Sequence, residues 1–305
     1  MQVLWVVVST FLFATMGVCI KYASVSFNTA EIVFYRGLMG MAILWAMSRS
    51  QGVSLKTAHP LMHAWRSITG VTSMGCWFYA LTQIPLASAM TLNYMSSLWI
   101  AVILLLGAAW TLRPGYRGQR QALNIPLVIT IAIGFAGVVL MLQPSFAQDQ
   151  TVPALIGLCS GLLSALAYMQ LSAMARIGEP ESRTVFYFGL GSTLMGLGGM
   201  LFMGMSPWPG WQQALWLIPL GVLAAGGQIT LTKAYSSAKT QRATLVAANL
   251  QYSGIVFASL YSLFLFGDAL GIAGWTGMAL IVICGIAASI FRARGAAQPV
   301  PASKA

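Results

Sequence analysis

Long apolar stretches, each about the length of a membrane-spanning helix, follow one another through almost the whole chain. A helix needs roughly 20 mostly apolar residues to cross the ~30 Å hydrocarbon core of a bilayer. The stretches that meet this requirement are 3–22, 29–47, 64–82, 87–111, 124–143, 153–175, 184–205, 212–232, 242–266 and 271–291. The pattern predicts an all-α integral membrane protein with ten transmembrane helices.

The composition excludes a water-soluble fold. Charged residues make up 7% of the chain and hydrophobic residues 58%, whereas a soluble domain normally carries about a quarter charged residues. So few charges cannot cover a water-facing surface. The first stretch has no small-residue cleavage site before polar sequence, so we expect a retained helix rather than a signal peptide.

The basic residues indicate an orientation, because Lys and Arg favour cytoplasmic loops. With the N-terminus inside, the cytoplasmic side holds fourteen of the sixteen: Arg49, Lys56, Arg66, Arg113, Arg117, Arg120, Arg176, Arg183, Lys233, Lys239, Arg242, Arg292, Arg294 and Lys304. Lys21 and Arg36 remain within or at the edge of spans. We therefore expect a multi-pass membrane protein with both termini cytoplasmic. This placement explains the net charge of +11 without a nucleic-acid partner.

The two halves of the chain repeat each other. The phrase "VFYRGL" at 33–38 returns as "VFYFGL" at 185–190, and only Arg36 changes, to Phe188. That offset is 152 residues; an offset of 154 aligns Ala80 with Ala234, and one of 151 aligns Ser9 with Ser160.

These matches divide the chain into two units of five spans each, 1–145 and 151–292, followed by a tail at 293–305 that we expect to be a disordered cytoplasmic end. Because five is odd, the second unit must enter the membrane from the opposite side. We therefore expect two inverted five-helix repeats, an arrangement common among secondary transporters. Small residues should allow close helix contacts: Gly37, Gly40, Gly189, Gly191, Gly198 and Gly199.

The phrases "EIVFYRGL" (31–38) and "LQYSGIVFASLYSLFLFGD" (250–268), in two five-span repeats, resemble the EamA-type branch of the drug/metabolite transporter superfamily. The resemblance covers the chain apart from its tail. The first half of the chain departs from the family pattern at Arg113–Pro114, where EamA-type repeats often carry an acid. The second half keeps this acid as Asp268.

The resemblance implies a secondary transporter that moves small polar or amphipathic metabolites across the bacterial inner membrane by alternating access. It implies export of amino acids or their derivatives, including opine-type metallophores. The alternative within the family is an importer of a cofactor or amine such as S-adenosylmethionine, riboflavin or choline. We expect a monomer, with a dimer as the alternative, whose partners are the metabolite and the bilayer.

Two cations inside spans are the first candidates for a binding site, because an ionisable residue in the membrane is expensive. Arg36 could face the central cavity and bind a carboxylate or phosphate. Alternatively, it could reach the outer interface or pair with Glu31 or Asp268. Lys21, at the end of the first span, has the same two interpretations.

Polar and aromatic residues complete the candidate site. In the fourth span Asn93 and Ser97 follow helical spacing with Tyr94 alongside, and the ninth span carries Gln251. They could line a cavity or join helices by hydrogen bonds. The other candidates are Tyr35, Trp77, Tyr79, Tyr168 and Gln228. Such a lining suits an amphipathic ligand, with rings for its flat or cationic parts.

The spans contain no paired carboxylates, HExxH, Ser/His/Asp set or nucleotide-binding loop. We therefore expect no enzyme activity, no cofactor and no metal site, and the four cysteines should be small buried hydrophobes. Two further hypotheses remain: an intramembrane enzyme acting on lipids or peptides, which lacks catalytic groups, and a non-transporting membrane subunit or sensor. The latter would fill the fourth and ninth spans with large apolar residues, which Asn93, Ser97 and Gln251 contradict.

Overall fold

The computed structural model describes residues 2–50, 52–111, 125–142, 150–237, 250–268 and 271–296. Throughout these ranges the regular structure is helical. The elements are α1 (Gln2–Ala23), α2 (Thr29–Ser50), α3 (Pro60–Gln83), α4 (Leu86–Tyr94), α5 (Ser96–Thr111), α6 (Ile125–Leu142), α7 (Thr151–Arg176), α8 (Glu181–Met203), α9 (Trp211–Ala214), α10 (Leu217–Ser236), α12 (Ser253–Phe266) and α13 (Ile272–Ala296).

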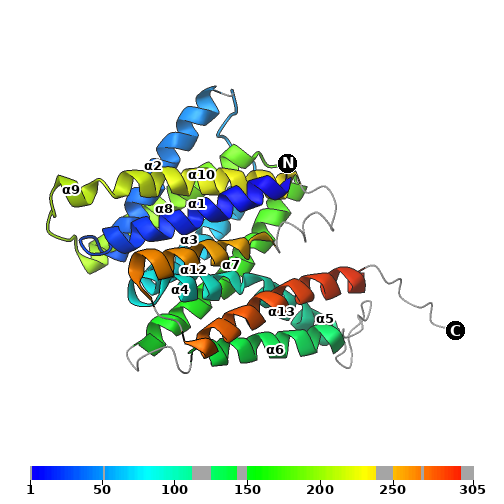
Figure 1. Cartoon of the computed structure of the whole chain (residues 1–305). Coiled ribbons are helices and arrows are strands. Elements are labelled where there is room, and N and C mark those ends of the chain that lie inside the picture. The colour runs from blue at the N-terminus through cyan, green and yellow to red at the C-terminus, as the bar shows by residue number, and fades with distance from the viewer. Residues whose placement is uncertain are drawn as a thin grey trace.

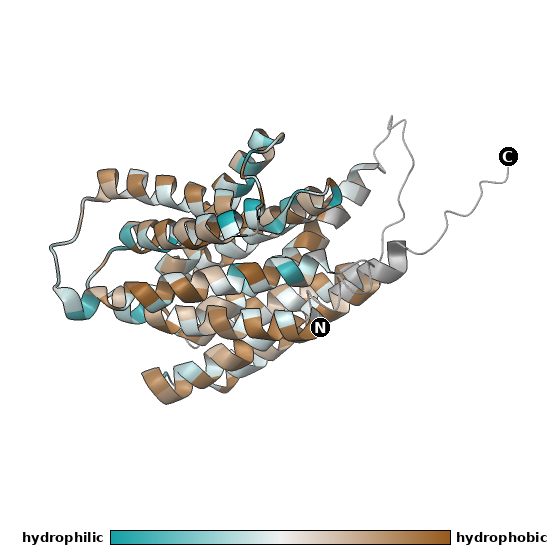
Figure 2. Cartoon of the chain, turned by 90° about the horizontal axis from the view of Figure 1, so that it is seen from above, coloured by the Kyte–Doolittle hydropathy of each residue, from teal (hydrophilic) through white to brown (hydrophobic). Residues whose placement is uncertain are grey.

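The helices have the length and composition of membrane spans. Among the residues that the structure describes, six candidate spans are long and apolar enough to cross a bilayer: Val3–Ala23, Thr29–Ser50, Leu86–Gly107, Thr151–Arg176, Glu181–Met203 and Trp211–Tyr235. Shorter apolar helices occupy 128–140, 253–266 and 272–288. Figure 2 shows hydrophobic residues along nearly the full length of the long helices. The prediction of an all-helical integral membrane protein is confirmed.

The structure refines several predicted boundaries. The predicted spans 87–111 and 212–232 correspond to the candidate spans Leu86–Gly107 and Trp211–Tyr235. The first is interrupted at Met95, between α4 and α5, and the second is divided into α9 and α10. In the ninth predicted span, residues 251–252 form a turn before α12, and 242–249 lie outside the described residues. α3 begins at Pro60, four residues early, since proline is favoured in the first turn of a helix.

Four helix pairs form the body of the molecule (Figure 1). α2 packs on α8, α3 on α7, α1 on α10, and α6 on α13. The last pair lies along one flank, away from α1 and α10. The main hydrophobic core joins α1, α3 and α4, and includes Met16, Phe78 and Leu92.

Glycines bring α2 and α8 into backbone contact. A Cβ atom on Gly37 would lie 2.6 Å from the backbone nitrogen of Thr193, and one on Gly189 would lie 3.0 Å from that of Met41. The segments that carry the repeated phrase therefore cross each other. Gly191 and Gly199 are also in contact as expected, whereas Gly40 and Gly198 would have no atom within 4 Å of an added Cβ.

This crossing predicts opposite outcomes for two glycines of one helix. Gly37→Ala should lower the melting temperature of the purified protein, because overpacking a rigid contact costs about 1–3 kcal/mol. Gly40→Ala is the matched control, because a Cβ atom at this position would enter open space. This variant should have an unchanged or higher melting temperature. Thermal unfolding in detergent measures both. Equal melting temperatures for the two variants would contradict the close α2–α8 contact.

Candidate functional site

A central cavity of about 70 Å³ lies between α1, α2, α3, α4, α7, α8 and α10. Polar, aromatic and charged groups from these helices converge on it. Six of the eleven residues proposed from the sequence line it: Arg36, Trp77, Asn93, Tyr94, Tyr168 and Gln228. The structure thus brings together residues that are up to 192 positions apart in the chain.

Arg36 faces this cavity and not the outer interface. Its side chain is 4% exposed, and its guanidinium carbon lies 5.3 Å from the ring centre of Phe188 on α8. Its nearest hydrogen-bond partner is the Ser192 hydroxyl, at 3.5 Å. Arg36 and Phe188 occupy the one position at which the two repeated phrases differ, and the fold places them in contact.

The two acids considered as partners of Arg36 are engaged elsewhere. Glu31 accepts hydrogen bonds from the backbone nitrogen of Asn28 and from the hydroxyl of Ser206, at 2.7 and 2.6 Å. Asp268 lies 3.7 Å from the Lys21 ammonium and accepts a bond from Ser262. The ion-pairing interpretation of Arg36 was therefore wrong.

A second arginine lies in the same cavity. Counting basic residues placed Arg66 in a cytoplasmic loop, and this assignment was wrong. Arg66 lies in the second turn of α3, 5% exposed, with its guanidinium carbon 4.7 Å from the Phe188 ring centre. The positive-inside rule missed it because the rule assigns any cation near a predicted span end to the adjacent loop.

A stripe on α3 could have revealed Arg66. Arg66, Gly70, Ser73 and Trp77 recur at helical spacing, and all four line the cavity. Gly70 leaves room for the arginine, because a Cβ there would collide with the Arg66 guanidinium and come within 2.8 Å of the Phe188 ring.

The cavity holds positive charge without a neutralising acid. Within the described ranges the ion pairs are Lys21–Asp268, His63–Glu179 and Arg183–Glu179, and none reaches Arg36 or Arg66. The Nε atom of each buried arginine has no hydrogen-bond partner in the described part of the chain. A cation over an aromatic ring gains about 2 kcal/mol when desolvated, less than the several kcal/mol that burying an ion costs. The site is therefore suited to an anion.

Neutral donors extend this surface. Asn93 on α4 donates from Nδ2 to the hydroxyls of Ser160 and Ser164 on α7, at 3.0 and 3.2 Å. Asn93 thus both lines the cavity and joins two helices, so the two interpretations of this residue hold together. The buried indole nitrogen of Trp77 has no hydrogen-bond partner.

Three of the other predicted site residues, Lys21, Tyr35 and Tyr79, do not line the cavity. Lys21 lies at the far end of α1, where its ammonium is 4.6 Å from the Phe266 ring centre. Tyr35 packs edge-on against Phe27, and Tyr79 is 37% exposed. Ser97 lies in α5, but its side chain is outside the described part of the structure.

A larger vestibule of about 640 Å³ adjoins the cavity. It lies one turn along the same helices, since Leu171, Val185 and Thr232 line it where Tyr168, Phe188 and Gln228 line the cavity. The rings of Tyr168 and Tyr235 stack between the two spaces, with centroids 6.5 Å apart. Gln251 donates a hydrogen bond to the Tyr235 hydroxyl at 3.1 Å, so this predicted residue supports the boundary.

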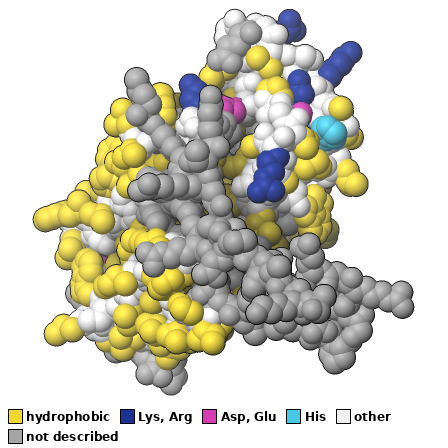
Figure 3. Space-filling view, turned by 90° about the vertical axis from the view of Figure 1, so that its right-hand side faces the viewer, with side chains coloured by type: hydrophobic (Ala, Val, Ile, Leu, Met, Phe, Trp, Pro, Cys, Tyr) yellow, Lys and Arg dark blue, Asp and Glu magenta, His cyan; other side chains and the backbone are white. Residues whose placement is uncertain are grey.

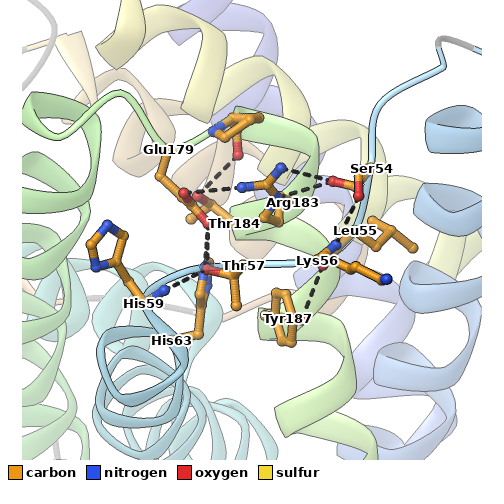
Figure 4. Close-up of polar contacts among 11 residues, drawn as sticks. Ser54, Leu55, Lys56, Thr57, His59, His63, Glu179, Arg183, Thr184 and Tyr187 are labelled. Carbon is orange, nitrogen blue, oxygen red and sulfur yellow. Dashed lines mark hydrogen bonds and ion pairs between the residues drawn. The ribbon is translucent and has the colours of Figure 1, made fainter.

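Glu179 organises the rim of the vestibule (Figure 4). Its carboxylate lies 2.8 Å from His63 Nε2, accepts a hydrogen bond from the Thr57 hydroxyl at 2.8 Å, and lies 3.2 Å from Arg183 Nη1. Arg183 also donates to the Ser54 carbonyl oxygen. These bonds fix the segment before α3 to the turn between α7 and α8.

The contacts of Glu179 predict how the stability of the folded protein depends on pH. Burial alone would raise the pKa of Glu179, but hydrogen bonds from His63, Thr57 and Arg183 lower it from 4.5 to about 2. A carboxyl with a depressed pKa stabilises the folded protein above its unfolded pKa, and the effect is lost as the pH falls from 4.5 toward 2.

Glu179→Gln should therefore melt at a lower temperature than the unaltered protein at pH 7. The difference should shrink as the pH is lowered from 4.5 to 3, because the Glu179 carboxyl of the unfolded chain then binds a proton while that of the folded protein stays ionised. Tryptophan fluorescence during heating in detergent measures this. A difference that stays constant from pH 7 to pH 3 would show that the ionised carboxylate is not the stabilising group.

Comparisons with known proteins agree with this architecture. The chain is 32% identical to a pseudopaline exporter of Pseudomonas aeruginosa over 288 residues, which cover 92% of this chain and 94% of that protein. It is 26% identical over 285 residues to an uncharacterized transporter of Helicobacter pylori, with coverage of 90% and 89%. It is 22% identical over 268 residues to an S-adenosylmethionine uptake transporter of Rickettsia prowazekii, with coverage of 87% and 84%.

No family model matches the chain. A solved crystal structure has the same fold, with a TM-score of 0.64 and 20% identity over 95% of this chain and 97% of that one. The named relatives are transporters and not enzymes, which confirms the prediction of a transport function. The chain belongs to the family of membrane transporters that includes the pseudopaline exporter of Pseudomonas aeruginosa.

Proposed function

We propose that this transporter exports amino acids or amino-acid derivatives, opine-type metallophores among them, across the bacterial inner membrane by alternating access. The observation that carries the proposal is the buried guanidinium of Arg36, which faces a central cavity and has no acidic partner among the described residues. Amino-acid derivatives supply carboxylates that would pair with it. The relationship to an exporter of pseudopaline, an opine-type metallophore, agrees with this substrate class.

The proposal includes two inverted five-helix repeats, 1–145 and 151–292, of the EamA type. Contacts between the halves support it because they are reciprocal, as expected around a two-fold axis. Gly37 meets Thr193, and with the offset of 152 residues the equivalent pair is Gly189 and Met41, which also meet.

Two further contacts are reciprocal in the same way, with the offset of 151, 152 or 154 residues that aligns each segment. Gly221 meets Met39, and the equivalent positions, Ser67 and Gly191, meet as well. Ser9 donates a hydrogen bond to the Gly227 carbonyl oxygen at 2.9 Å, and their counterparts Ser160 and Ser73 are bonded at 2.7 Å. These pairs support a rocking motion of one half against the other, which is how inverted repeats give alternating access.

The orientation with both termini in the cytoplasm makes this an inward-facing state. The vestibule opens where α2, α7 and α10 end, and basic side chains gather at that end of the molecule (Figure 3). Basic residues mark the cytoplasmic side of membrane proteins. An exporter would load its substrate through this opening.

Contacts at the opposite end would then close the outer side. Tyr22 on α1 stacks on Trp216 at the start of α10, with ring centroids 4.7 Å apart. The Lys21–Asp268 ion pair joins α1 to the end of α12.

We propose that one chain suffices for transport, because the cavity is lined within a single chain.

Import of S-adenosylmethionine is the second candidate, and the 22% identity to an uptake transporter favours it. The charge of the cavity weighs against it. S-adenosylmethionine carries a sulfonium cation as well as an ammonium group, and two buried guanidiniums would repel both.

Replacing Arg36 with Phe, the residue of the second copy, should abolish transport without reducing the amount of protein in the membrane. Metabolite profiling inside and outside cells, with the protein deleted or overproduced, identifies the transported compound. Export predicts that this compound accumulates inside on deletion and outside on overproduction.

Arg49→Phe is the matched control, because Arg49 lies exposed at the end of α2. It should transport normally. Unchanged transport by Arg36→Phe would remove Arg36 from the binding site, and a compound that needs the protein to enter cells would reverse the direction.

A further inference from the structure

We infer that the central cavity recognises two carboxylates of one ligand, which Arg36 and Arg66 bind together over the ring of Phe188. The inference rests on the proposed function and narrows its substrate class from amino-acid derivatives in general to dicarboxylates and larger polycarboxylates. It adds Arg66, which was not among the residues predicted from the sequence to form the site, as a second determinant of specificity.

The two guanidiniums form one charged site. Their central carbons lie 5.3 and 4.7 Å from the centre of the same aromatic ring, so they are no farther apart than the sum of these distances. Both side chains are more than nine-tenths buried, and each keeps an Nε–H without a partner. Two like charges in a low-dielectric interior are strongly unfavourable until an anion neutralises them.

Carboxylates fit this arrangement better than a single point charge would. A guanidinium presents a planar fork of N–H donors that matches the two oxygens of a carboxylate. Two forks on separate helices, α2 and α3, provide two such sites. A ligand with one carboxylate would leave one guanidinium unpaired, and a cationic ligand would be repelled, so the site selects against both.

The volumes of the cavity and the vestibule indicate where each part of a ligand would lie. The central cavity of about 70 Å³ has room for a few water-sized groups, whereas small-molecule sites usually enclose about 300–1,000 Å³. The adjoining vestibule of about 640 Å³ is within that range. The carboxylates would therefore enter the cavity while the body of the ligand lies in the vestibule, beside the stacked Tyr168 and Tyr235.

Both anchoring charges belong to the first half of the chain. The equivalent positions in the second half hold Phe188 and Leu220, and Leu220 is fully buried. The second half supplies the aromatic surface and no cation at these positions. The ligand's charges would stay bound to α2 and α3 while α8 moves past them.

Binding of defined probes to the full-length purified protein tests this inference. The probes are N-(1-carboxyethyl)-alanine, a dicarboxylate of the opine class, its monoamide of nearly equal size, inorganic phosphate, and S-adenosylmethionine. Isothermal titration should show that the dicarboxylate binds about 10- to 100-fold more tightly than the monoamide, the factor expected for hydrogen bonds to a charged group. Phosphate and S-adenosylmethionine should bind more weakly than the dicarboxylate.

Arg66→Gln should lower the affinity for the dicarboxylate by a similar factor and remove its advantage over the monoamide. Arg66→Lys keeps the charge but loses the fork, so an intermediate loss is expected. Arg49→Gln, the same change at an exposed site, should bind all probes like the unaltered protein. The ligand-free Arg66→Gln protein should also melt no lower than the unaltered protein, because it lacks one unpaired buried charge.

Three outcomes would overturn the inference: equal affinity for dicarboxylate and monoamide, tighter binding of phosphate or S-adenosylmethionine, or full discrimination in Arg66→Gln. A lower melting temperature for ligand-free Arg66→Gln would assign Arg66 to folding instead. Failure of the two proposals can be told apart. An exported compound without two carboxylates would refute only this inference, whereas dicarboxylate binding without transport of any metabolite would refute only the proposed function.

Discussion

The contact between α2 and α8 determines where the charged groups of the cavity lie. Gly37 and Gly189 allow the two backbones to touch, and this brings Arg36 against Phe188 one residue before each glycine. Arg66 reaches the same ring from α3 because Gly70 leaves its path open. The specificity of the site therefore depends on three positions that carry no side chain.

Two buried arginines without acidic partners among the described residues lower the stability of the folded protein. Leaving a buried ion without a partner costs more than a ring contact returns. Acids could have neutralised these charges, but those in the described ranges lie at the ends of helices and at the rim: Glu31, Glu179, Glu181 and Asp268. The cost of the unpaired arginines is consistent with a role in which a ligand completes the site.

Much of this arrangement could be predicted from the sequence, because apolar length and the positions of polar residues on helices are local properties. The helical membrane fold, Arg36, Asn93 and Tyr168 were identified in this way. Arg66 was missed because span boundaries are uncertain by about a turn, and one turn separates a loop cation from a buried one. The break at Met95 has neither glycine nor proline to mark it, and the Lys21–Asp268 pair depends on tertiary packing.

The crossing of the two repeated phrases also limits how such a chain can arise. If "VFYRGL" occurred in both copies, Phe188 would be an arginine and two guanidiniums would face each other at the crossing. If "VFYFGL" occurred in both, the crossing would be wholly apolar, with one charge of the cavity lost. A symmetric assembly of two identical half-length subunits could not hold one arginine against one phenylalanine there. The pairing of Arg36 with Phe188 therefore requires two different copies, and joining them in one gene ensures that each molecule receives one of each.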